Sequence, residues 1–185
     1  MEMTEHTKIP QDELEVFKSL PDIKVVVDVG ARADVEYLDL RPDIELHAFE
    51  PNPEFFAQLK EKIGDRQAHL NNFGLGDVKG ELPYSDGRQG FVGGEEPTIT
   101  QGRLLPVQTL DDYVYEKGIQ QIDFLKIDTE GYDFKVLLGA LNTIPKCRYI
   151  QYEHWNDLRR FHILLGQQFK MEYIGNRNVL CTRLW

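Results

Sequence analysis

The sequence has few cysteines and no long apolar run. Only two cysteines occur among the 185 residues, and Cys147 and Cys181 lie in separate apolar segments without CxxC spacing. We therefore expect buried free thiols rather than a disulfide framework or a zinc site. No segment approaches the roughly 20 apolar residues that cross a bilayer, and the charged N-terminal stretch does not match a signal peptide. These absences predict a soluble, cytoplasmic protein without a membrane partner.

Basic charge is also scarce. The chain has 21 Lys and Arg against 31 Asp and Glu, which gives a formal net charge of −10 at pH 7. Its longest basic feature is the Arg159-Arg160 pair, and a net negative charge repels phosphate backbones. We therefore expect no nucleic-acid partner. With 41% hydrophobic residues and this length, the chain is expected to form a single domain over residues 1–185.

Apolar runs alternate with helical patterns along the chain, which predicts an α/β sheet. A β-branched run ending in glycine, residues 23–30, is typical of a parallel strand covered on both faces. Residues 1–20 are expected to form a helical extension and residues 80–106 a hairpin or mobile insert. The remaining expected strands are 43–49, 69–77, 122–128 and 147–154; the expected helices are 52–64, 109–118, 133–141 and 157–169; residues 170–185 are expected to form an antiparallel hairpin.

Capping residues support two of these helices. Asn52 is expected to cap the helix that begins at Pro53 and ends at Gly64, and Thr109 is expected to cap the next. The stretch between Gly30 and Glu50 is short for a helix plus a strand. The first helix after the central strand is therefore expected to be abbreviated.

Acidic residues occur at five successive strand ends, although a single strand-terminal acid is more often a cap or a turn residue. In open parallel sheets, ligands bind beyond these ends. Glu50 lies at roughly the 20-residue offset from Asp28 at which nucleotide-binding folds place an acid on ribose hydroxyls. The alternative to a ribose-binding role is a purely structural one, in which Glu50 only precedes a helix. The strand-end residues are Asp28 and Gly30, Glu50, Asp77, Asp128 and Glu130, and Glu153 and His154.

Five motifs in order carry a family resemblance: "VVVDVGA", "LHAFEPNP", "GLGD", "TLDDY" and "IDFLKIDTEGYDFKVLLGA". Together they resemble the FkbM family of S-adenosylmethionine-dependent methyltransferases over about residues 25–153. The resemblance implies a Rossmann-like class I methyltransferase fold: a seven-stranded, mostly parallel sheet with a C-terminal antiparallel hairpin and helices on both faces. It also implies S-adenosylmethionine as cofactor and transfer of a methyl group to a hydroxyl of a small molecule or saccharide.

The resemblance also implies site residues. It places Glu50 on the cofactor's ribose, Asp77 beside the adenine and Asp128 near the sulfonium, where carboxylates are physically suitable. The methionine part would lie against Asp28, Gly30 and Ala31. Asp128 and Glu130 would form the floor where cofactor and acceptor meet.

The first loop departs from the family pattern. Related sequences have a second glycine in a pattern like DVGANxG, whereas this chain has Arg32 and Asp34 at the Asn and second-Gly positions. A positive φ at Asp34 would cost about 1–2 kcal/mol. We expect Arg32 to compensate by binding the cofactor's methionine carboxylate through its guanidinium.

The residue that removes the acceptor's proton is less clearly indicated. His154 has a reference pKa near neutrality and is a candidate base, together with Glu130 and Asp128; the alternative is that His154 packs among aromatics. These three residues would also be candidates to hold a divalent cation, but no ligand spacing is diagnostic and no metal site is expected. Two alternative functions remain: a non-catalytic S-adenosylmethionine-binding module, and a nucleotide-dependent oxidoreductase. The absence of GxGxxG after the first strand weighs against the second.

Overall fold

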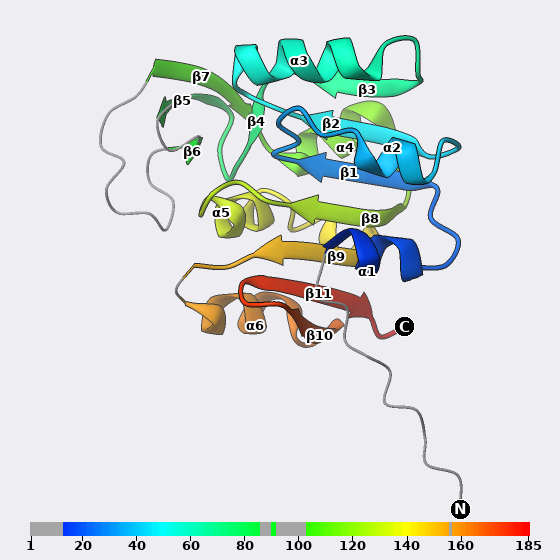
Figure 1. Ribbon diagram of the computed structural model, residues 1–185. Coiled ribbons are helices and arrows are strands. Elements are labelled where there is room, and N and C mark those ends of the chain that lie inside the picture. Colours follow the sequence, from blue (N-terminus) through cyan, green and yellow to red (C-terminus); the bar gives the residue numbers. More distant parts are fainter. Residues whose placement is uncertain (1–12, 86–89, 92–102, 156) are drawn as a thin grey trace, which may run out of the picture.

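The computed structural model describes residues 13–85, 90–91, 103–155 and 157–185, and a seven-stranded sheet forms its centre (Figure 1). The strand order is β10-β11-β9-β8-β1-β2-β3. Strands β9, β8, β1, β2 and β3 are parallel, and β11 runs antiparallel to β9 and β10. The strands are β1 (Val25–Val29), β2 (Glu45–Phe49), β3 (Ala68–Asn71), β8 (Ile122–Ile127), β9 (Cys147–Glu153), β10 (Phe169–Ile174) and β11 (Asn178–Arg183).

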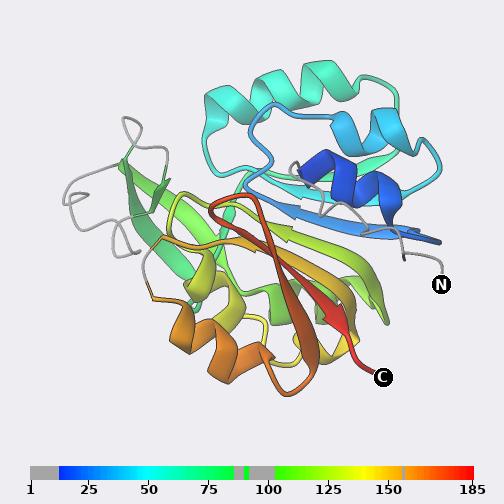
Figure 2. The same ribbon diagram turned by 60° about the horizontal axis from the view of Figure 1, so that its bottom comes forward.

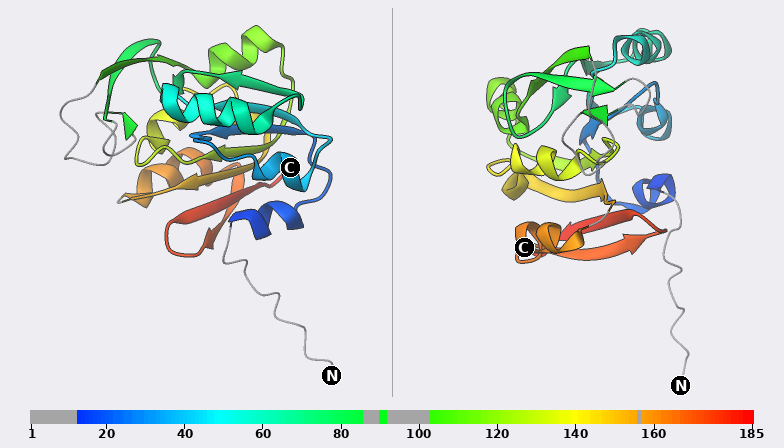
Figure 3. Two further views of the ribbon diagram at one scale, coloured as in Figure 1. Left: turned by 45° about the horizontal axis from the view of Figure 1, so that its top comes forward. Right: turned by 90° about the vertical axis from the view of Figure 1, so that its left-hand side faces the viewer.

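Helices cover both faces of this sheet, and Figure 3 shows α1, α2 and α3 on one side and α4, α5 and α6 on the other. Each described helix is too short or too polar to cross a membrane. The helices are α1 (Glu13–Ser19), α2 (Glu36–Leu40), α3 (Pro53–Ile63), α4 (Leu110–Lys117), α5 (Asp133–Leu138) and α6 (Leu158–Leu165), with a 3-10 turn, η1, at Ile144–Lys146.

Two apolar clusters hold the layers together. Phe17, Leu38 and Leu59 of α1, α2 and α3 are buried in one cluster, and the helices of the other face contribute to the second. Every residue of β8 is buried, as expected for a central strand covered on both faces. Phe124 belongs to the first cluster and Leu125 and Ile127 to the second, so this strand contributes to both. Full burial of a side chain such as Phe124 stabilises the fold by roughly 1.5–3 kcal/mol.

A second, four-stranded sheet lies beyond the carboxyl ends of β1 and β8 (Figure 1). Its order is β4-β7-β5-β6, and β5 pairs antiparallel with both β6 and β7. Within residues 80–106, expected as a hairpin or mobile insert, the described strands pair antiparallel, and residues 86–89 and 92–102 lie outside the described residues. The strands are β4 (Gly74–Leu75), β5 (Gly80–Ser85), β6 (Gly90–Phe91) and β7 (Arg103–Gln108).

The local predictions from the sequence are largely confirmed. The Asn52 side chain accepts hydrogen bonds from two backbone N–H groups at the start of α3, and Thr109 accepts one at the start of α4. Helix α2 has only five residues, as the short connection indicated. Strands β10 and β11 form the expected terminal hairpin, which Figure 2 shows in the foreground. Both cysteines are buried and free.

One connection differs from its prediction. The segment expected as a third strand with its loop contains β3 and then β4, which leaves the main sheet and pairs in parallel with β7. Asp77 therefore follows a strand of the small sheet rather than a carboxyl end of the main one. The expected N-terminal extension is described only as α1, since residues 1–12 lie outside the described residues.

Candidate active site

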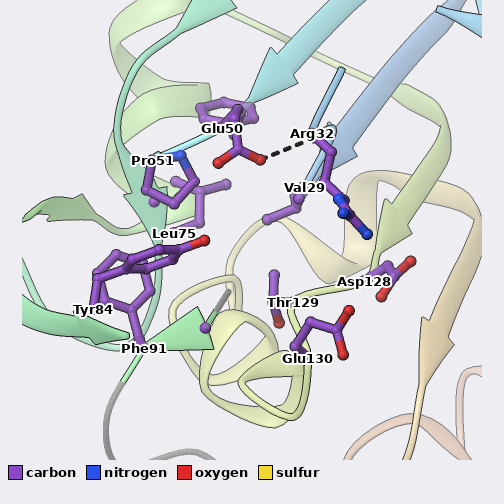
Figure 4. A pocket seen from close by; sticks show the side chains of 14 residues that line it. Val29, Arg32, Glu50, Pro51, Leu75, Tyr84, Phe91, Asp128, Thr129 and Glu130 are labelled. Carbon is purple, nitrogen blue, oxygen red and sulfur yellow. Dashed lines mark hydrogen bonds between the residues drawn. The ribbon is translucent and has the colours of Figure 1, made fainter. Parts of the chain in front are cut away.

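A pocket lies at the carboxyl ends of β1, β2 and β8, between the main and the small sheet (Figure 4). The strand order reverses between β1 and β8, which is where open α/β sheets bind ligands. Five residues that the sequence indicated for the site line this pocket: Gly30, Arg32, Glu50, Asp128 and Glu130.

The loop after β1 forms one wall, and its backbone is constrained at two positions. Gly30 has φ 85°, and a Cβ there would come within 1.9 Å of the Asp128 carbonyl oxygen. Close approach of the β1 and β8 loops therefore requires a glycine at this position, which also lines the pocket. The positive φ considered for Asp34 falls instead at Arg32, with φ 48°. Backbone strain at a pocket-lining residue is typical of functional sites.

Glu50 connects this loop to the pocket. Its carboxylate accepts the backbone N–H of Arg32 at 2.9 Å through Oε2 and that of Asn52 at 2.7 Å through Oε1. The residue is only 2% exposed, and burial raises the pKa of its carboxyl to about 7. Each oxygen keeps a further lone pair, so Glu50 can accept additional hydrogen bonds from a ligand in the pocket.

The turn after β8 forms the opposite wall. Glu130 has φ 54°, and the turn is held from behind by Asp133, which sequence reasoning missed. The Asp133 carboxylate accepts the Thr129 N–H at 3.3 Å, the Thr129 hydroxyl at 2.9 Å and the Glu153 N–H at 3.1 Å. Burial raises the pKa of Asp133 to about 8. Its only signal in the sequence is an acid four positions after Thr129, at the first turn of a helix.

The two acids that face the pocket share a strongly acidic environment. Burial, followed by the neighbouring Asp128 charge, raises the pKa of Glu130. Lys126 lies behind Asp128, with its Nζ 3.4 Å from an oxygen of Asp128 and 3.4 Å from Oδ1 of Asp28. Asp28 is buried beside a separate cavity that Asp128 also lines. Lys126 therefore forms ion pairs both with Asp128 of the pocket and with Asp28 of the adjoining cavity.

The structure does not bring the other expected residues into the pocket lining. Ala31 is buried in the apolar cluster of the α1–α3 face. Asp77 accepts a hydrogen bond from Lys135 Nζ at 2.7 Å. The His154 ring packs edge-on against Tyr173, with ring centroids 6.3 Å apart, and burial lowers its pKa. Asp28, as described above, lines the adjoining cavity.

An aromatic wall from the small sheet closes the pocket, and sequence reasoning missed it as well. Tyr84 and Phe91 line the pocket and pack edge to face, with centroids 5.4 Å apart. Phe91 fits against Gly74, where a Cβ would lie 2.1 Å from the ring. These contacts depend on pairing within the small sheet, which the many glycines and prolines of this region concealed in the sequence.

The strand order and the position of the pocket define a Rossmann-like class I methyltransferase fold. Two solved structures share it: an rRNA methylase from Streptococcus thermophilus (TM-score 0.55, 11% identity, covering 93% of this chain and 94% of that one) and the magnesium protoporphyrin IX methyltransferase of Synechocystis with bound S-adenosylmethionine (TM-score 0.51, 11% identity, 92% and 74%).

The model of the methyltransferase FkbM domain matches residues 28–171, and the chain belongs to this family. The curated relative "2-O-methyltransferase NoeI" of Sinorhizobium fredii is 26% identical over 83% of this chain and 74% of its own length. "Hexuronic acid methyltransferase AglP" of Haloferax volcanii is 25% identical over 68% of this chain and 54% of its own. The protein is an S-adenosylmethionine-dependent methyltransferase, and the family expected from its motifs is confirmed.

Proposed function

We propose that the protein transfers the methyl group of S-adenosylmethionine to a hydroxyl oxygen of a saccharide or a related small molecule. The observation that carries the proposal is the pocket at the β1–β8 reversal, in which Glu50 lies opposite Asp128 and Glu130. The names of the two curated relatives, a 2-O-methyltransferase and a hexuronic acid methyltransferase, support the oxygen and sugar specificity.

The residues present fit the cofactor. The free lone pairs of the Glu50 carboxylate would accept the ribose hydroxyls, and the apolar wall with Tyr84 and Phe91 is suited to a purine ring. Arg32 brings a guanidinium to the edge of the pocket, where it would bind the methionine carboxylate. Asp77, which pairs with Lys135, and the buried Ala31 and Asp28 would support this arrangement without lining the pocket.

The cofactor supplies an electrophilic methyl group on a positively charged sulfonium. The carboxylates of Asp128 and Glu130 provide the complementary negative potential. Glu130 is the base we favour for the acceptor hydroxyl, because its raised pKa brings it closer to the working pH. His154 stays a second candidate, since its ring nitrogens have no hydrogen-bond partner among the described residues.

The acceptor we propose is small rather than a nucleic acid. The net charge of −10 and the acids of the pocket disfavour a polyphosphate chain, even though solved structures of this fold include an rRNA methylase. The cytoplasmic location and the single-domain organisation over residues 1–185 stay predictions from the sequence.

Calorimetric titration tests cofactor binding at this pocket. We expect S-adenosylhomocysteine to bind the wild type, and Glu50→Ala or Glu50→Gln to weaken that binding by about 1.5–3 kcal/mol, the range for hydrogen bonds to a charged group. Equal affinity in wild type and both variants would remove Glu50 from the ribose role. The family match sets aside the oxidoreductase alternative, so titration with NAD serves as the negative control.

Turnover with a panel of free sugars and uronic acids tests the chemistry. We expect Glu130→Gln and Asp128→Asn to lower kcat with little change in affinity for S-adenosylhomocysteine, which lacks the sulfonium charge. His154→Ala, at the second candidate base outside the pocket lining, should leave kcat unchanged. If His154→Ala lowers kcat and Glu130→Gln does not, the base assignment is wrong. Cofactor binding without turnover on any hydroxyl acceptor would contradict the proposed acceptor class. Unchanged kcat after chelation would exclude a cation at Asp128 and Glu130, the two of the three candidate ligands that line the pocket.

A further inference from the structure

A cluster of three metal-ligating side chains lies on the β2–β3 edge of the main sheet, apart from the pocket. Glu45 and His47 are two positions apart on β2, so they share one face of the sheet. The parallel register places His69 of β3 beside His47. The two imidazole rings are stacked, with centroids 4.4 Å apart and planes inclined by 11°. Strand pairing therefore brings the three side chains together.

The separations of the donor atoms match a metal site. Glu45 Oε1 lies 3.1 Å from His47 Nε2 and 3.6 Å from His69 Nε2. In a tetrahedral site with bonds of about 2.0–2.1 Å, two ligand atoms lie about 3.3 Å apart. One oxygen and two imidazole nitrogens all lie within 4.8 Å of one another. The stacked rings cannot both direct an in-plane lone pair at one ion, so the half-exposed His69 side chain must rotate out of the stack for all three atoms to coordinate it.

The His47 ring is fixed by a partner on its other side. His47 is 1% exposed, and its Nδ1 lies 2.8 Å from the hydroxyl of Tyr113 on α4. That hydroxyl also accepts a hydrogen bond from Asn71 Nδ2 at 3.3 Å. Metal-binding histidines typically donate their second ring N–H to such a partner, which orients the ring and leaves the other nitrogen free. Here Tyr113 directs Nε2 of His47 towards Glu45.

We propose that Glu45, His47 and His69 bind a divalent transition-metal ion, and that this ion is Zn²⁺. Two imidazoles and a carboxylate suit Zn²⁺, Cu²⁺ and Ni²⁺ better than Mg²⁺ or Ca²⁺, which prefer oxygen ligands. The side chains of Glu45 and His69 are 54% and 50% exposed, so an ion can enter from solvent and keep a water as fourth ligand.

The site has a structural role in this proposal. It connects the edge strand β3 to β2, and its residue His47 lies about 10 Å along the chain from Glu50, given the rise of a strand. Binding to the folded state alone stabilises that state by mass action. The metal would therefore strengthen the strand that carries Glu50 without taking part in methyl transfer.

Metal titration of the full chain, prepared without a histidine tag and stripped with a chelator, tests the proposal. We expect one equivalent of Zn²⁺ by calorimetry, visible absorption bands on addition of Co²⁺, and a higher Tm with Zn²⁺. His69→Ala should weaken binding at least about tenfold, because loss of even an outer-shell partner costs 10–100-fold. Glu45→Gln should weaken it similarly. His69 is chosen over the buried His47 because the variant should fold, which circular dichroism verifies.

His162→Ala is the matched control, since His162 is exposed on α6 and its Nδ1 contacts the Leu158 carbonyl. This variant should bind Zn²⁺ as the wild type does. Absence of stoichiometric binding, or wild-type affinity in His69→Ala, would overturn the proposal and leave Glu45 as a hydrogen-bond partner of the two imidazoles. Loss of binding in His162→Ala would place the ion elsewhere and overturn it equally.

Discussion

The two loops that form the pocket walls follow neighbouring parallel strands, but different residues hold them. The loop after β1 is held by Glu50, whose carboxylate also faces the pocket. The turn after β8 is held by Asp133, which lies buried behind the turn. The first anchor is therefore available to a ligand, whereas the second is shielded from it. Ligand binding should affect the first loop more directly than the second.

The two loops also contact each other through backbone. Asp128 N–H donates to the Val29 carbonyl oxygen at 3.0 Å, and the Asp128 carbonyl oxygen occupies the space where a Gly30 side chain would lie. Both loops contain a non-glycine residue with positive φ, Arg32 and Glu130. The two loops are therefore constrained together. Substitutions in them should show which residues are needed for packing of the loops and which for ligand binding.

The largest effect is expected for Gly30→Ala. Its Cβ would lie 1.9 Å from the Asp128 carbonyl oxygen in a backbone with φ 85°, so both loops must shift. We expect the free energy of unfolding, measured in urea, to fall by about 3–5 kcal/mol. Gly118→Ala is the matched control, because Gly118 has φ 68° with open space around it. It should cost only about 1–2 kcal/mol; equal losses would show that backbone conformation, not loop contact, requires Gly30.

The next effect is expected for Asp133→Ala. It leaves the Thr129 and Glu153 N–H groups without their acceptor, which should cost about 2–4 kcal/mol of stability and lower kcat by displacing the turn. Because burial raises the folded-state pKa of Asp133 to about 8, its contribution is fully present below about pH 4 and is lost as pH rises through 8.

The Asp133→Ala loss should consequently be larger at pH 6 than at pH 9, as urea unfolding at both pH values would reveal. Thr129→Val, which removes only the hydroxyl donor, should cost about 1 kcal/mol, and more at pH 9 than at pH 6 because that hydrogen bond favours the ionised carboxylate. A pH-independent Asp133→Ala loss would mean that the buried carboxyl does not titrate in this range.

The sequence was sufficient for elements whose signals are local. Caps such as Asn52 and Thr109 determine where α3 and α4 begin, and the turn sequence GNRN at residues 175–178 determines the terminal hairpin. The order of the parallel strands required the family resemblance, since a βαβ pattern alone leaves the position of each strand open. Glu50, which lines the pocket, was indicated by its place at a strand end and its offset from Asp28.

What the sequence concealed depends on contacts between distant segments. Asp133 acquires its role only because Thr129 and Glu153 approach it from different elements, and Tyr84 reaches the pocket through pairing of the small sheet. Asp77 was misplaced relative to the main sheet because β4 leaves it for the small one. His69 meets His47 only through the register of β2 and β3.

A smaller effect is expected from Glu50→Gln on the pH dependence of stability. Burial raises the folded-state pKa of Glu50 from 4.5 to about 7, so its contribution is present below about pH 4.5 and is lost as pH rises through 7. The wild type should therefore lose more stability between pH 5 and pH 8 than the variant, by up to about 3 kcal/mol. Urea titrations of both proteins at each pH measure the difference. Parallel curves would contradict the pKa of about 7.

The smallest effect is expected for Arg32→Ala, and it separates the side chain of the first loop from its backbone. The Arg32 N–H that donates to Glu50 survives the substitution, and the φ of 48° is equally unfavourable for alanine, so stability should change little. The guanidinium, which lies 5.1 Å from the centroid of the Phe55 ring, is lost. If it binds the methionine carboxylate, S-adenosylhomocysteine should bind about tenfold more weakly while adenosine, which lacks that carboxylate, binds as before. Calorimetry with both ligands provides the comparison. Equal losses of affinity for both ligands would mean that Arg32 supports the loop. Unchanged affinity for both would mean that its side chain points to solvent.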